Sequence, residues 1–143
     1  MKLTTAMLAD DAFVASNGKL YIHGGAWTRV LSQTFPATHP KMAVVLVLEV
    51  DYGEALQNHT VEVVLLKDGE PVGPRVQGML SVGHPPRTKL GAPAQIPMVF
   101  AFQMLTFDTP ARYEWEVLAA NESVGNIVME VVPVQLPPKV PSS

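Results

Sequence analysis

The residues most suggestive of chemistry are two adjacent carboxylates, Asp10 and Asp11. Carboxylates that converge can bind a divalent cation or share acid and base roles. Neighbouring residues of a strand point to opposite faces, so this pair converges only inside a turn. We expect instead that one of the two accepts hydrogen bonds from backbone N–H groups where the first strand ends. The pair is kept as a candidate polar cluster, and a metal-assisted hydrolase is the least favoured function.

The other residue types that carry chemistry show no catalytic pattern. His23, His39, His59 and His84 have neither i,i+4 nor H-x-H spacing, so they form no local metal motif. The chain has no cysteine, and it contains no G-x-S-x-G, P-loop or dinucleotide fingerprint. We therefore predict no catalytic residue, no metal site and no cofactor, and we expect a protein that is not an enzyme.

A stretch rich in proline and glycine, residues 83–97, is the first candidate for a binding surface. It carries His84, Arg87 and Lys89, and loops on a rigid scaffold commonly hold binding residues. Trp27 follows two glycines, so it is either a core residue or an exposed interface residue. These four residues form the candidate surface for a ligand or partner, with ordinary solvation of a loop as the simpler alternative.

The charge balance and the apolar runs exclude some partners. Lysine and arginine total 10 against 13 aspartates and glutamates, which gives a formal net charge of -3. A chain-wide basic footprint for nucleic acid is therefore excluded. No apolar run reaches the roughly 18 residues of a membrane span, and residues 1–11 do not match a signal peptide. We expect a cytoplasmic protein that binds neither nucleic acid nor a membrane.

The elements that must position these residues are strands. The chain carries 13 prolines and 10 glycines along its length, and few intervening segments are long enough for a helix. Between these breakers, apolar residues alternate with period two, and Asn17-Gly18 is a hairpin-type turn signal. The pattern predicts an all-β protein, an antiparallel β-sandwich of about 7–9 strands, with an Ig-like topology as a weaker expectation.

The strands are expected within one domain over residues 1–134, followed by a flexible, proline-rich tail over residues 135–143. The expected strands are residues 3–9, 19–23, 26–31, 42–52, 58–67, 72–82, 98–107, 113–117 and 125–134. Tyr113 and Trp115 share one face of an alternating strand, so we expect both in the core.

The segment Met42–Val50 is apolar on both faces as far as Glu49. A strand with one solvated face should alternate, so either the rest of the chain or a second subunit covers the outer face. The low charged fraction, 16%, favours the subunit. We predict a homo-oligomer, most simply a dimer, that works through protein–protein contacts with itself and an unidentified partner. The alternative is a small-ligand-binding module that uses the 83–97 loop.

Short motifs follow one another along most of the chain. They are Leu8-Ala9-Asp10, Gly18-Lys19-Leu20, Gly24-Gly25-Ala26-Trp27, His39-Pro40, Gly83-His84-Pro85-Pro86 and Pro110-Ala111-Arg112-Tyr113-Glu114-Trp115. In this order they resemble a widespread family of short bacterial and phage proteins without an assigned function. The resemblance implies a compact β-sandwich, and it carries no catalytic residue, cofactor or partner. Ala111 departs from the family pattern, which has glycine before the basic and aromatic pair.

Overall fold

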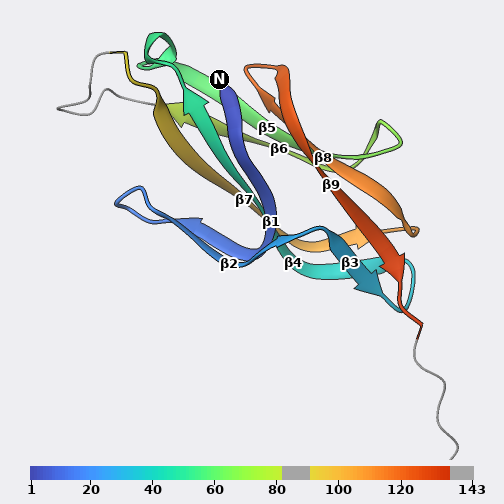
Figure 1. Cartoon of the computed structure of the whole chain (residues 1–143). Helices are drawn as coiled ribbons and strands as arrows, with labels where there is room; N and C mark the ends of the chain where they lie inside the picture. Colours follow the sequence, from blue (N-terminus) through green and yellow to red (C-terminus); the bar gives the residue numbers. More distant parts are fainter. Residues whose placement is uncertain (82–90, 136–143) are drawn as a thin grey trace, which may run out of the picture.

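The computed structural model describes residues 1–81 and 91–135, which form nine strands and one short 3-10 helix (Figure 1). The strands are β1 (Lys2–Val14), β2 (Leu20–Trp27), β3 (Arg29–Ser32), β4 (Ala37–Val50), β5 (Asn58–Lys67), β6 (Glu70–Ser81), β7 (Ala94–Phe107), β8 (Ala111–Ala119) and β9 (Glu122–Pro133). The 3-10 helix η1 (Tyr52–Glu54) lies between β4 and β5. The predicted all-β class is confirmed.

The strands form two sheets. Sheet 1 has the order β2-β1-β4-β7, and sheet 2 has the order β3-β9-β8-β5-β6. Every neighbouring pair is antiparallel except β3 and β9, which run parallel with Arg29 beside Glu130. The chain changes sheets at Thr28, between β2 and β3. The expected strand over residues 26–31 is therefore two strands, one in each sheet.

The main core lies between the two sheets, because inward residues of both sheets belong to one buried cluster. Phe102 of sheet 1 stacks on Trp115 of sheet 2 with ring centroids 4.7 Å apart. Phe107 meets Tyr113 edge to face at 5.0 Å, and the Tyr113 hydroxyl donates to the Thr109 carbonyl at 2.9 Å. Both Tyr113 and Trp115 are buried, which confirms their predicted place in the core.

Strand β4 is buried on both faces, as its sequence suggested. One face joins the main core, and the other face, with Ala43 and Val45, joins a second apolar cluster on the outside of sheet 1. That second cluster is completed by Met7, Ala9, Ala12, Leu20, Ile22 and Val99. All of these residues come from the same chain. Because the chain itself covers both faces of β4, the apolar pattern of this strand does not require a second subunit. The homo-oligomer stays a prediction, and the pattern of β4 no longer supports it.

Several expected boundaries differ from the structure, and three of the differences involve residues of the candidate sites or the expected loops. Strand β1 continues through Asp10 and Asp11 to Val14, so neither aspartate ends the strand. Residues 37–41, expected in a connection, begin β4; Pro40 is tolerated because the ladder pairs His39 and Lys41 with β7 and skips the proline. Residues 94–97, expected in the loop, begin β7. The strands predicted from the sequence are too short because the prediction places their ends at isolated polar residues and prolines.

Candidate interaction surface on the first hairpin

The hairpin formed by the end of β1 and the start of β2 has one anchored face and one open face. Ala12 pairs with Ile22, and both belong to the apolar cluster on the outside of sheet 1. The opposite face pairs Phe13 with Tyr21. The turn of the hairpin projects at the left of Figure 1. Because one face is packed on the sheet, the other face is held out in a fixed position.

The open face presents a stacked aromatic pair. The ring centroids of Phe13 and Tyr21 are 5.0 Å apart and their planes differ by 10°. Phe13 is 49% exposed and Tyr21 is 43% exposed, and neighbouring Val14 is also exposed. Among the large apolar side chains exposed in the described residues, these are the two aromatic ones. Large, rigid aromatic side chains are enriched at protein interfaces and at their binding hot spots.

Polar groups of the hairpin and of the neighbouring strand β4 lie near the aromatic pair. Asp11 lies opposite His23, and Lys41 of β4 donates to Asp11 Oδ1 at 3.2 Å. The Ala12 backbone N–H also donates to Asp11 Oδ1, at 3.0 Å. The hydrogen bond from Lys41 is the main cause that holds the Asp11 pKa below its ordinary value. Asp11 is therefore an ionised acceptor beside the aromatic pair.

Asp10 and Asp11 point to different neighbours. Asp11 engages Lys41, while the Asp10 carboxylate lies against Gly24 of β2. Gly24 has a φ of +62°, and a Cβ there would collide with the Asp10 side chain. The two carboxylates do not form a shared acid or metal site. The expected hydrogen bond from a backbone N–H is present at Asp11, but inside β1 and not at its end.

The histidines of the described residues are dispersed. The His39 ring lies 5.6 Å from the Trp27 ring, and His59 Nε2 donates to the Glu54 carbonyl at 2.7 Å. His23 lies on the hairpin. In residues 1–81 and 91–135, no three histidine, aspartate or glutamate side chains are arranged to hold a metal ion.

The predicted ligand surface is described only in part. His84, Arg87 and Lys89 lie outside the described residues. Trp27 ends β2, is partly buried and packs against the main core. Its indole Nε1 is buried and has no hydrogen-bond partner among the described residues. The structure therefore places Trp27 at the border of the core, and the ligand-binding alternative stays a prediction.

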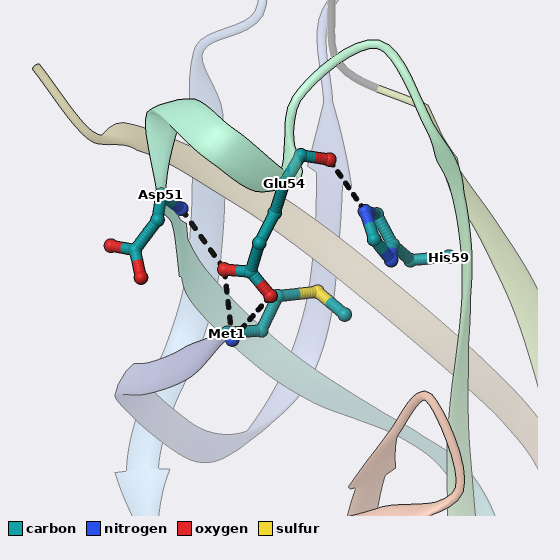
Figure 2. Close-up of polar contacts among 4 residues, drawn as sticks. All are labelled: Met1, Asp51, Glu54 and His59. Atoms are coloured by element: carbon teal, nitrogen blue, oxygen red, sulfur yellow. Dashed lines mark hydrogen bonds and ion pairs between the residues drawn. The ribbon is translucent and has the colours of Figure 1, made fainter. Parts of the chain in front are cut away.

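A second polar cluster joins the N-terminus to the β4–β5 connection (Figure 2). The Met1 ammonium group donates to both carboxylate oxygens of Glu54, at 3.0 and 2.9 Å. The Asp51 backbone N–H donates to the same carboxylate at 3.2 Å. The hydrogen bonds from the ammonium group are the main cause of the lowered pKa of Glu54. These contacts tie β1 to the β4–β5 connection.

A hollow of about 220 Å³ lies beside the turn between β5 and β6. It is lined by Leu66, Asp68, Gly69, Arg112, Tyr113 and Glu114. Pockets for small organic ligands usually enclose about 300–1,000 Å³. This hollow is smaller, and it is not the loop end that the sequence favoured as a ligand site.

Sequence reasoning missed the aromatic pair and one buried carboxylate. Phe13 and Tyr21 lie on either side of the Asn17-Gly18 turn, which indicates a hairpin but not the register that pairs these two residues. Glu62 of β5 is buried, and Arg75 Nε and Gln77 Nε2 of β6 donate to its two oxygens. Arg75 is therefore engaged by a carboxylate of the same chain.

The fold and this surface define a two-sheet β-protein with a projecting aromatic hairpin. The chain belongs to a family of unknown function, DUF6941, whose model matches residues 4–132. A search of curated proteins finds no match. None of the helical segments within the described residues has the length and apolarity of a membrane span.

One solved structure similar to this chain is Pseudomonas fluorescens alkylpurine DNA glycosylase AlkC bound to DNA containing an abasic site analog. The TM-score is 0.45 and the sequence identity is 14%. The match covers 88% of this chain and 30% of the glycosylase chain, so the chain spans less than a third of that protein. A likeness at this TM-score carries no argument about function.

Proposed function

We propose that this chain is a non-enzymatic binding protein that works through protein–protein contacts, with a second copy of itself and with a partner protein. The observation that carries the partner contact is the exposed Phe13–Tyr21 pair on the anchored hairpin. We further propose that it does so in the cytoplasm, without a cofactor. The cysteine-free composition is compatible with that compartment.

The aromatic pair suits an interface because it offers apolar area at low entropic cost. The two rings are already stacked, so a partner need not order them. The packed face of the hairpin, with Ala12 and Ile22, fixes the backbone beneath them. Binding energy at interfaces concentrates on a few aromatic anchors surrounded by a polar rim. Asp11 and Lys41 supply such a rim.

The partner contact is tested by quantitative affinity capture from a lysate of the source cell. The baits are the wild type, the double variant Phe13→Ser/Tyr21→Ser and a control double variant, Leu56→Ser/Met79→Ser. Leu56 and Met79 are also exposed apolar residues, but they lie outside the hairpin. We expect a protein that the wild type and the control retain and the hairpin variant loses by at least tenfold. Equal capture by all three baits would contradict the proposal.

A further inference from the structure

The two sheets have four edge strands, and three of them carry features that prevent pairing with another strand. Strand β3 has four residues and begins with Arg29. Strand β6 contains Pro71 and Pro74, which cannot donate a ladder hydrogen bond. Strand β2 is interrupted by Gly24 and Ala26, both at positive φ. Long, flat, uncharged edges are the ones prone to pairing.

Strand β7 is the exception among the four edges. It is 14 residues long and contains no charged residue. Pro97 lies near its start, and Met104, at a φ of +54°, lies near its end. The intervening residues 98–103 contain no proline, glycine or charge. In the described part of the chain, β7 pairs with β4 on one side only.

The inner face of this edge is already covered by the chain itself. Gly78 of β6 lies so close to Met98 and Phe100 of β7 that a Cβ at this position would be only 3.0 Å from the Met98 side chain and 3.3 Å from the Phe100 ring. Phe100 and Phe102 are buried in the main core. The backbone groups along the free edge of residues 98–103 are therefore the part of β7 left to bind something. Only another β-strand matches that row of donors and acceptors.

We propose that two copies of the chain join through the free edges of β7, antiparallel about a twofold axis near Ala101. This inference rests on the self-association in the proposed function and names its surface. Pairing of this kind joins the two copies of sheet 1 into one continuous sheet of eight strands, since each sheet 1 has four.

The sequence of β7 is complementary to itself in this arrangement. Twofold antiparallel pairing must match outer-face residues with outer-face residues, because a slip of one residue exchanges the faces. The outer-face residues are Val99, Ala101 and Gln103, which carry no charge, so no like charges meet across the axis.

The proposal is tested by size-exclusion chromatography with light scattering. We expect the wild type at twice the chain mass of 15.5 kDa. Ala101 is exposed, so Ala101→Lys places two ammonium groups near the axis and should halve the mass. Ala101→Glu should also be a monomer, and an equimolar mixture of the two variants should restore the dimer. Leu31→Lys, at an exposed position of β3, which is an edge strand of sheet 2, is the matched control and should stay dimeric.

The outcomes separate this inference from the proposed function. A wild-type dimer that Ala101→Lys leaves intact would overturn the β7 edge as the surface, while self-association would stand. A wild type that stays monomeric at millimolar concentration would overturn the self-association and the edge together, and the capture experiment would still judge the partner contact. If Ala101→Lys does not fold by circular dichroism, Ala101→Glu replaces it, with the same expected loss of mass, because its two carboxylates also meet at the axis.

Discussion

Glu62 allows the most direct test of the forces that hold the two-sheet structure together. Its side chain is 7% exposed on β5, where Gln77 Nε2 donates to one oxygen at 2.9 Å and Arg75 Nε donates to the other. The hydrogen bonds from Gln77 and then from Arg75 hold the Glu62 pKa below its ordinary value. The substitution Glu62→Gln keeps the shape of the side chain and removes its charge.

The expected cost at pH 7 is about 2 kcal/mol of unfolding free energy. Hydrogen bonds to a charged group contribute about 1.5–3 kcal/mol each, but the Arg75 side chain is 62% exposed, so water screens its share. A glutamine at this position can accept from one donor only. Its amide N–H₂ group then faces the other donor, which leaves that donor without its acceptor.

The pH dependence has a definite sign. The folded-state pKa of Glu62 lies below its unfolded value of about 4.3, so its stabilisation is fully present above that pH. It is lost as the pH falls through the folded-state pKa, where the carboxyl group of the wild type is protonated. The difference between wild type and Glu62→Gln should therefore be about 2 kcal/mol at pH 7 and shrink towards zero in acid.

The assay is urea denaturation followed by tryptophan fluorescence at several pH values between 7 and 2.5. Glu114→Gln is the matched control, because Glu114 accepts from Asn126 Nδ2 at 2.8 Å on an exposed part of the same sheet. The control should change stability by less than about 0.5 kcal/mol. A difference for Glu62→Gln that stays constant down to pH 2.5 would refute the ionised buried carboxylate, and so would no difference at pH 7.

Three further predictions concern particular local contacts. Gly24→Ala should lower stability by about 1–2 kcal/mol in thermal melts, because an alanine is strained at the positive φ of Gly24 and its Cβ would collide with the Asp10 side chain. Adding Asp10→Ala should recover part of the loss, and no recovery would contradict the collision. Ala120→Gly should raise the melting temperature by about 2–4 °C, because Ala120 has a φ of +51° in the β8–β9 turn; a lower melting temperature would contradict this. Glu54→Gln should lower the melting temperature at pH 7 and lower it less near pH 3, because the Met1 ammonium group lowers the pKa of Glu54; equal losses at both pH values would contradict this.

Local patterns in the sequence were sufficient for the fold class and for several turns. The Asp68-Gly69 turn has both residues at positive φ, as its residue types indicate. Alternation placed Tyr113 and Trp115 in the core, because a period of two on a strand directly separates the buried face from the exposed one. These features depend only on neighbours along the chain.

Register was not predictable from the turn signals, and this hid the candidate surface. A two-residue turn at Asn17-Gly18 would pair Phe13 with Ile22 and place them on the same face. The structure has a longer loop, closed by the Ala15 N–H donating to the Lys19 carbonyl at 2.9 Å. Phe13 therefore pairs with Tyr21. One residue of slip moved an aromatic side chain from the packed face to the open one.

The partners of Glu62 were hidden for the same reason. Counting back from the Asp68-Gly69 turn pairs Glu62 with Arg75, but the irregularity in the ladder between Val64 and Leu66 shifts the partner to Gln77. Arg75 still reaches the carboxylate from the neighbouring position. A single-sequence pattern has no signal for this shift, because it depends on how β6 bends beside β5.

The structure also changes where contacts with other molecules are expected. The two-faced apolar strand β4 favoured a subunit interface on a sheet face, but the chain covers both faces of β4 itself. Polar contacts, Glu62 with Arg75 and Arg29 with Glu130, lie on the outer face of sheet 2. Among the described residues, the uncovered groups include the aromatic pair of the first hairpin and the backbone edge of β7. The hairpin and the β7 edge are separate surfaces, and an interface at either one is small and directional. A single charge at Ala101 should therefore weaken self-association and leave the hairpin contact unchanged.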